Sequence, residues 1–167
     1  MNKRSQVTGN VGLYFVCYHL SRLGWNAMPT SRNARGIDIL AYDADCTRTI
    51  SLQVKTLSKR APVPLGKGLD RMLADYWVIV NNVETTPAVF VLTPDEIKER
   101  AHRGERDGNI SYWLQPKDYE LEQFRDCWDR IGTPYKPNHS VHRTAAGHGR
   151  SGVGFAADVH GSSRGGR

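Results

Sequence analysis

Near its N-terminus the chain carries a helical pattern of apolar residues. They recur at spacings of three, four and three, which places them on one face of an α-helix. These residues are Leu13, Val16, Leu20 and Leu23. Thr8 can cap the start of such a helix, and Gly24 is a typical stop signal. The pattern therefore predicts a helix from about Gly9 to Leu23.

The next pattern is that of a β-hairpin. Residues 37–42 are an apolar run interrupted by one carboxylate, Asp38, and residues 43–48 are polar. Residues 49–55 then alternate with period two, so that apolar side chains face one way and polar side chains the other. Together these segments predict two antiparallel strands joined by a turn.

The second half of the chain alternates between strand and helix signals. Residues 76–80 and 88–92 are short β-branched and aromatic runs that suit buried strands. Thr93-Pro94-Asp95-Glu96 has the capping residue, proline and glutamate that begin a helix, and Gly104 would end it. Two further elements are expected, an edge strand at residues 111–114 and an amphipathic helix over residues 121–131. The order of elements predicts an α/β fold with a mixed β-sheet flanked by helices.

The composition changes after Pro137. Seven of the 16 glycines and four of the six histidines fall in the last 30 residues, where large apolar residues almost vanish. Such a segment cannot bury enough surface to offset its ordering entropy. We therefore expect one domain over residues 1–137 and a disordered basic tail, rich in Gly, His and Arg, over residues 138–167.

The net charge of +6 and the pI near 9.4 favour an anionic partner, with nucleic acid first among the candidates. Most of the basic excess lies in residues 1–71, which hold eleven Lys and Arg against four Asp and Glu. No apolar run approaches the length of about 20 residues that a bilayer requires, so neither membrane insertion nor secretion is expected. The three cysteines are far apart and fit neither a disulfide framework nor a Cys-x-x-Cys metal site. The expected compartment is the cytoplasm.

The hairpin would bring reactive side chains together if its turn were centred between residues 45 and 46. Residues whose numbers add to 91 would then face each other, so Asp38 would lie opposite Gln53, and the pleat would return Lys55 to the face of Gln53. A carboxylate, an amide oxygen and a backbone carbonyl such as that of Val54 are the hard donors that Mg²⁺ prefers. Lys55 could orient or deprotonate a water there and oppose charge on a phosphate.

Gly36-Ile37-Asp38-Ile39-Leu40 followed by Leu52-Gln53-Val54-Lys55 resembles the core of the PD-(D/E)XK nuclease superfamily, in the variant where Gln replaces the acid of the second motif. Mrr-type restriction enzymes carry a similar Gln-x-Lys. The resemblance extends from Gly9 to about Ile131 and includes a leading helix of the form Gly-x-x-Gly-x-x-x-Val. It implies a restriction endonuclease-like fold and hydrolysis of phosphodiester bonds with Mg²⁺ or Mn²⁺, in DNA more than in RNA.

The resemblance also implies roles for individual residues. Asp38, Gln53 and Lys55 would be the catalytic residues. Asp38 would bind the metal, Gln53 would stand at the second ligand position, and Lys55 would support the attacking water. The carbonyl of Val54 completes the expected set of metal ligands.

One position departs from the family pattern and leaves alternatives open. Relatives often carry a glutamate on the first helix, but the expected place holds Leu13, so Asp38 is the only carboxylate of the cluster. A catalytically weak or inactive nucleic-acid-binding module of the same fold is therefore an alternative to the nuclease. A second alternative is a protein-interaction role, as an immunity or regulatory protein, with the twelve acidic residues of residues 72–137 as its surface.

Basic residues flank the cluster in the sequence and are candidates for binding the nucleic-acid backbone. They are Arg32, Arg35, Lys59 and Arg60, with Lys67 and Arg71 further along. A soluble basic surface without a ligand would give the same pattern. His19 would be a metal ligand only if its face of the first helix points at Asp38. The sequence also leaves a homodimer open.

Overall fold

A computed structural model describes residues 3–31 and 36–135. The chain divides into two units, Met1–Lys136 and Pro137–Arg167. The tail predicted at residues 138–167 lies outside the described residues, and so do Arg32 and Arg35. The helices are α1 (Lys3–Arg22), α2 (Pro94–Arg100), α3 (Pro116–Tyr119) and the 3₁₀-helix η1 (Trp128–Ile131).

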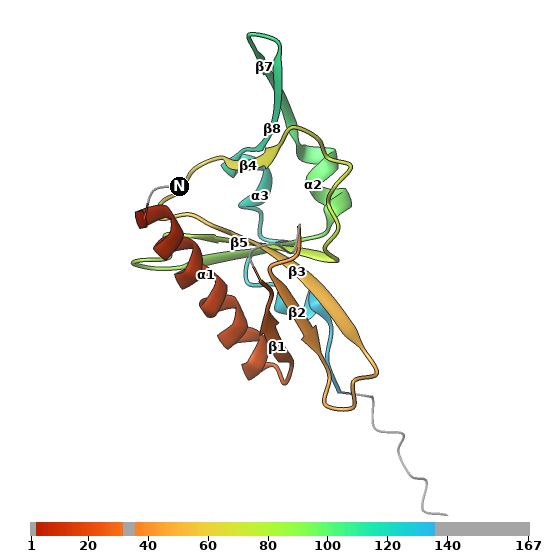
Figure 1. The fold of residues 1–167 in the computed structure, drawn as a ribbon. Coiled ribbons are helices and arrows are strands. Elements are labelled where there is room, and N and C mark those ends of the chain that lie inside the picture. The colour runs from red at the N-terminus through yellow and green to blue at the C-terminus, as the bar shows by residue number, and fades with distance from the viewer. Residues whose placement is uncertain (1–2, 32–35, 136–167) are drawn as a thin grey trace, which may run out of the picture. The chain divides into compact units, whose positions relative to one another are not determined.

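A five-stranded mixed sheet forms the centre of the first unit (Figure 1). Its strands are β1 (Asn26–Pro29), β2 (Ile39–Tyr42), β3 (Thr49–Thr56), β5 (Tyr76–Asn81) and β6 (Ala88–Leu92). They follow the order β1-β2-β3-β5-β6, in which β3 and β5 are parallel and the other neighbours antiparallel. The predicted α/β class, with a mixed β-sheet flanked by helices, is confirmed.

A second sheet of three strands contains β4 (Val63–Gly66), β7 (His102–Arg106) and β8 (Asn109–Leu114). The hairpin of β7 and β8 projects at the top of Figure 1. The prediction of an edge strand at residues 111–114 is wrong, because β8 pairs with β4 on one side and with β7 on the other. Gly104 does not end a helix either, since α2 has already ended and Gly104 lies within β7.

The predicted helix over residues 121–131 is wrong as well. In that range the structure has only η1, which is preceded by turns. The N–H of Val91 in β6 donates to the carbonyl of Phe124 at 2.9 Å, so the segment runs along the edge of the sheet. The apolar spacing comes from a loop that buries Phe124 and Ile131.

The helix α1 packs on one face of the sheet and begins before the predicted Gly9, because the polar residues ahead of it continue the helix without adding to the apolar pattern. Val16 and Leu20 are fully buried in a core shared with β2 and β3. Gly12 marks the closest approach of α1 to β3, since a Cβ there would overlap the side chain of Thr56. A separate core covers the other face, so the sheet is buried on both sides.

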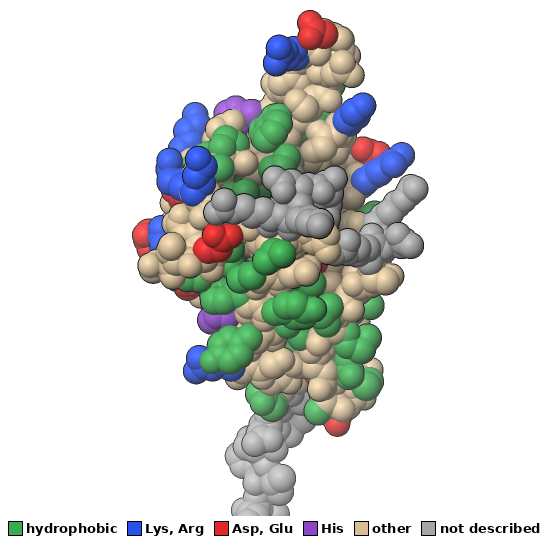
Figure 2. All heavy atoms as spheres, turned by 60° about the vertical axis from the view of Figure 1, so that its left-hand side comes forward, with side chains coloured by type: hydrophobic (Ala, Val, Ile, Leu, Met, Phe, Trp, Pro, Cys, Tyr) green, Lys and Arg blue, Asp and Glu red, His purple; other side chains and the backbone are tan. Residues whose placement is uncertain are grey.

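The outward face of α1 carries a row of apolar residues. The exposed large apolar residues are Val7, Val11, Tyr14 and Tyr18, at helical spacings of four, three and four. Figure 2, which turns the α1 side of Figure 1 forward, shows hydrophobic side chains over much of this face. Within the described part of the chain, no helix has the length and apolar character needed to cross a membrane.

Gly12→Ala should lower the free energy of unfolding by about 1–3 kcal/mol, because the new methyl group must displace Thr56 or move α1 away from β3. Gly9→Ala is the matched control on the same helix. A Cβ at Gly9 meets nothing within 4 Å, so this variant should gain up to about 1 kcal/mol from helix propensity. Urea unfolding measures both, and a loss of equal size in the two variants would contradict the close approach at Gly12.

Burial alone would raise the pKa of Glu96, but hydrogen bonds from Thr93 and Arg130, with the charge of Arg130, together lower it. The ionised carboxylate therefore stabilises the fold above the ordinary glutamate pKa of about 4.3, and this contribution is lost as the pH falls through the lower folded-state pKa. Glu96→Gln should cost about 1 kcal/mol at neutral pH and much less near about pH 3. Urea unfolding at both pH values tests this expectation. If the free energy of unfolding of the variant differed from that of the wild type by the same amount at both pH values, the expectation would be wrong.

Candidate functional site

The strands β2 and β3 pair in the register that the sequence predicts. Ile39 lies opposite Leu52 and Ala41 opposite Ile50, so the numbers of facing residues add to 91. The N–H of Asp38 donates to the carbonyl of Leu52 at 2.8 Å, one residue out of that register, so the pairing is irregular just before β2 begins. Asp38 therefore stands immediately before the first residue of β2.

Two hydrogen bonds join Asp38 to β3. Nε2 of Gln53 and the backbone N–H of Val54 both donate to Oδ2 of Asp38, the second at 2.7 Å. The N–H and C=O of one strand residue point to the same edge, so the carbonyl of Val54 also faces the side on which Asp38 lies. The fold thus brings together the three residues predicted as metal ligands.

Lys55 lies on the same face of β3 as Gln53, and its ammonium packs over an aromatic ring. Nζ is 5.2 Å from the centroid of the Trp77 ring, a cation–π contact. Trp77 is 4% exposed and is the parallel partner of Gln53 in β5. Burial lowers the pKa of Lys55, and the negative charge of Asp38 acts in the opposite direction. The ammonium is therefore partly desolvated and within the electrostatic influence of Asp38.

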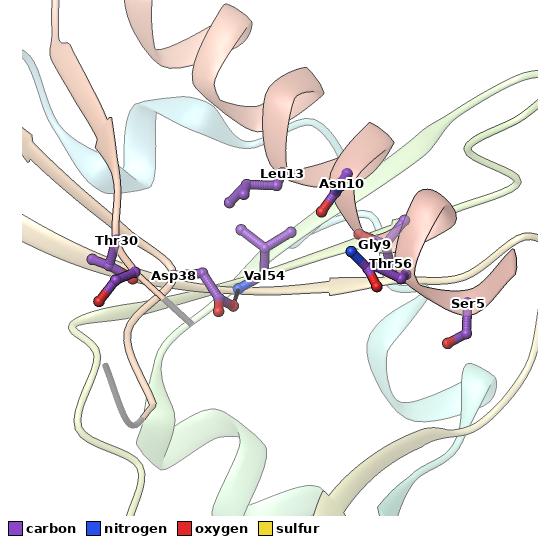
Figure 3. Close-up of a pocket in the computed structure, with 10 residues that line it drawn as sticks. Ser5, Gly9, Asn10, Leu13, Thr30, Asp38, Val54 and Thr56 are labelled. Atoms are coloured by element: carbon purple, nitrogen blue, oxygen red, sulfur yellow. Dashed lines mark hydrogen bonds between the residues drawn. The ribbon is translucent and has the colours of Figure 1, made fainter. Parts of the chain in front are cut away.

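A pocket of about 560 Å³ opens between α1 and the hairpin, with Asp38 in its wall (Figure 3). Figure 3 shows Thr30 and Asp38 side by side at one end and Leu13 over Val54. The lining residues are Ser5, Gln6, Gly9, Asn10 and Leu13 of α1, Thr30 and Ser31 after β1, Asp38, and Val54 and Thr56 of β3. Leu13, where the family resemblance leads one to expect a glutamate, shares this pocket with Asp38.

The sequence analysis did not predict that polar residues of α1 would belong to the site. Gln6 and Asn10 are four residues apart, and Leu13 follows three residues later, which places them on one helix face. The spacing of Gln6, Asn10 and Leu13 was the signal in the sequence from which their shared helix face could have been predicted. Apolar periodicity could not find it, because that pattern begins only at Leu13.

Asp38 is the one carboxylate among the described residues that line the pocket. Over residues 3–31 and 36–135 there is no group of three or more His, Cys, Asp or Glu side chains placed to hold a metal ion. The ring of His19 stacks on that of Trp128, with centroids 5.0 Å apart. His19 is not among the lining residues, so this geometry does not support the condition under which His19 would be a ligand, a helix face that points at Asp38.

Of the four predicted nucleic-acid contacts, Lys59 and Arg60 fall within the described residues, and both are exposed. Arg60 donates to Glu120 at 2.6 Å. The second carboxylate oxygen of Glu120 accepts from Asn81 at 2.8 Å. Arg60 therefore ties the segment after β3 to β5, whereas Lys59 has no such structural bond among the described contacts.

The structure thus places Asp38 just before β2, and Gln53 and Lys55 on the adjacent strand β3. No protein-family model matches the chain, and no curated protein sequence matches it. Among solved structures, the chain is similar to Hjc, a Holliday junction resolvase from the archaeal hyperthermophile Archaeoglobus fulgidus, with 16% sequence identity and a TM-score of 0.49. The match covers 68% of this chain and 88% of that chain. It assigns no residue and no reaction to this protein.

Proposed function

We propose that the chain is a metal-dependent nuclease that hydrolyses phosphodiester bonds, in DNA more than in RNA. The observation that carries the proposal is the convergence of Gln53 and the N–H of Val54 on the carboxylate of Asp38. These groups stand on paired strands that are packed on both faces, so the fold holds their geometry. The net charge of +6 favours a polyanionic substrate.

The oxygen donors around Asp38 fit Mg²⁺ or Mn²⁺. They are the carboxylate of Asp38, the carbonyl of Val54 and, once its amide is turned over, Oε1 of Gln53. Turning the amide exchanges its oxygen and nitrogen at nearly the same positions, and the amide already reaches Asp38. Mg²⁺ is commonly held by one or two carboxylates together with waters and substrate phosphates. A single carboxylate is therefore enough for a cation that the nucleic acid helps to hold.

When bound, the cation would supply positive charge beside the phosphate and make a water more acidic. Lys55, on the same face of β3 as Gln53, adds a second positive charge. Because its ammonium is held over the ring of Trp77, it needs little reorganisation when negative charge grows on the phosphate. Partial desolvation strengthens that electrostatic attraction.

A non-catalytic nucleic-acid-binding module is the second candidate, and Leu13 is the observation that favours it. An aliphatic side chain lines the pocket next to Asp38, so less negative charge is available to hold a dication. Exposed basic residues such as Lys59 would then bind the backbone without cleavage. The proposed compartment is the cytoplasm for both candidates, and sedimentation analysis would decide whether the chain forms a homodimer.

Asp38→Asn and Lys55→Met should each lower the rate of DNA cleavage with Mg²⁺ or Mn²⁺ by about a hundredfold or more, since each removes a charge that acts on the reacting phosphate. The assay follows supercoiled, linear and single-stranded DNA. Asp129→Asn and Lys117→Met remove the same charges from exposed positions elsewhere and should cleave like the wild type. Equal cleavage by all five proteins would contradict the assignment, and no cleavage by the wild type would favour the binding module.

Leu13→Glu should tighten Mn²⁺ binding by about tenfold, because it adds a second carboxylate to the pocket that holds Asp38. Calorimetric titration of the protein alone measures the change. Val7→Glu is the matched control, since it adds the same charge to the exposed face of the same helix. Equal tightening by both variants would mean that the charge acts at long range, and the proposed ligand position would be wrong.

A further inference from the structure

The pocket beside Asp38 has a lining that cleavage itself does not use. Along α1 its polar groups are the hydroxyl of Ser5 and the amides of Gln6 and Asn10, and the hydroxyl of Thr56 faces them from β3. Hydroxyl and amide side chains contact both phosphate oxygens and base edges. The hydroxyls and amides of this wall therefore suit a group that carries both donors and acceptors.

We propose that the pocket binds the base of an unpaired nucleotide next to the phosphodiester at Asp38. The inference rests on the proposed function, because it takes the Asp38 end of the pocket as the place of the phosphate. Nucleobases are neutral and planar, and their edges carry donors and acceptors that amide side chains can pair with in a bidentate manner. The substrate class is therefore nucleic acid with an unpaired nucleotide.

The two amides are placed for such recognition. Gln6 and Asn10 are one turn apart on α1 and line the same wall of the pocket. Each amide offers an acceptor oxygen and two donor hydrogens. Neither residue has a side-chain hydrogen bond among the described contacts of the chain, so neither amide would have to give up a partner within the protein in order to bind a ligand.

The remaining wall suits the flat face of a base. Leu13 lies over Val54 in Figure 3, and these aliphatic side chains form an apolar surface between the amides and Asp38. The volume of about 560 Å³ lies within the range of about 300–1,000 Å³ for small-molecule sites. The pocket thus has the size of a site for a small ligand.

Gly9 keeps the entrance along α1 open. A Cβ at this position meets nothing within 4 Å, in contrast to Gly12 one turn further along, where it would overlap Thr56. Gly9 lines the pocket between Gln6 and Asn10, so a large side chain there would fill the proposed base site without removing any of its hydrogen-bonding groups.

A base in an intact duplex is stacked and paired, and it must be extruded before it can enter a pocket of this kind. Extrusion lowers the binding affinity by several-fold to hundreds-fold. This loss is smallest for bases that are already unpaired. The protein should therefore prefer strands with an unpaired nucleotide over a continuous duplex of the same length and charge. The preference would come from the pocket and not from the basic surface, which both substrates contact equally.

The test measures binding of the full chain to fluorescent DNA by anisotropy, with Ca²⁺ in place of Mg²⁺ to limit cleavage. A duplex with one extrahelical nucleotide should bind about tenfold more tightly than the continuous duplex. Gly9→Phe should abolish this preference, and Gln6→Leu with Asn10→Leu should reduce it. Gln123→Leu, which removes an exposed amide elsewhere, should leave it unchanged. Thermal unfolding of Gly9→Phe confirms that the variant is folded.

Four outcomes would overturn the inference. Equal affinity for both duplexes in the wild type, or a preference that persists in folded Gly9→Phe, would exclude the base pocket, and the nuclease proposal would still stand on the cleavage assay of Asp38→Asn. Displacement of the DNA by free nucleoside monophosphates at the same nucleotide concentration would assign the pocket to a free nucleotide. Absence of any DNA binding at low salt would remove both the inference and the proposed function.

Discussion

The carboxylate of Asp38 accepts a hydrogen bond from the backbone of β3 where β2 supplies no backbone acceptor. The arrangement of the site depends on this hydrogen bond. The paired part of β2 begins at Ile39, so the N–H of Val54 has no backbone partner on that strand. Oδ2 of Asp38 accepts the bond instead, at 2.7 Å. The hydrogen bond to this N–H holds the carboxylate against β3. The same oxygen holds the amide of Gln53, and the chemistry proposed for the site uses groups that the sheet already orders.

The helix α1 determines how much space remains above that carboxylate. Contact between Gly12 and Thr56 brings the helix close to β3 at one turn, while Gly9, one turn earlier, has open space in front of it. The helix therefore closes the core at Val16 and Leu20 and leaves a pocket at its N-terminal half. Packing and access to Asp38 are thus controlled by two glycines three residues apart.

Much of this hairpin could be predicted from the sequence, because its information is local. The polar turn fixes the register, the period of two assigns each side chain to a face, and Asp38 and Gln53 meet as that register requires. The second sheet could not be predicted in the same way, since β4 and β7 are short and are defined by pairing with β8 from distant parts of the chain. The apolar spacing of residues 121–131 was misleading because a loop on the edge of β6 buries Phe124 just as a helix would. Gln6 and Asn10 were missed because polar residues on a helix are usually solvated, and only the position of β3 gives them a pocket.

The position of a bound cation relative to the hairpin tests most directly whether Asp38, Gln53 and Val54 hold the metal. Mn²⁺ broadens the NMR signals of nuclei close to it, so a titration of ¹⁵N-labelled protein can locate the ion residue by residue, with a cleavage-resistant oligonucleotide present. We expect the backbone signals of Asp38, Gln53 and Val54 to broaden first, and we expect Asp38→Asn to remove this broadening. Selective broadening elsewhere in the domain, or broadening at the hairpin that is unchanged in Asp38→Asn, would contradict this expectation.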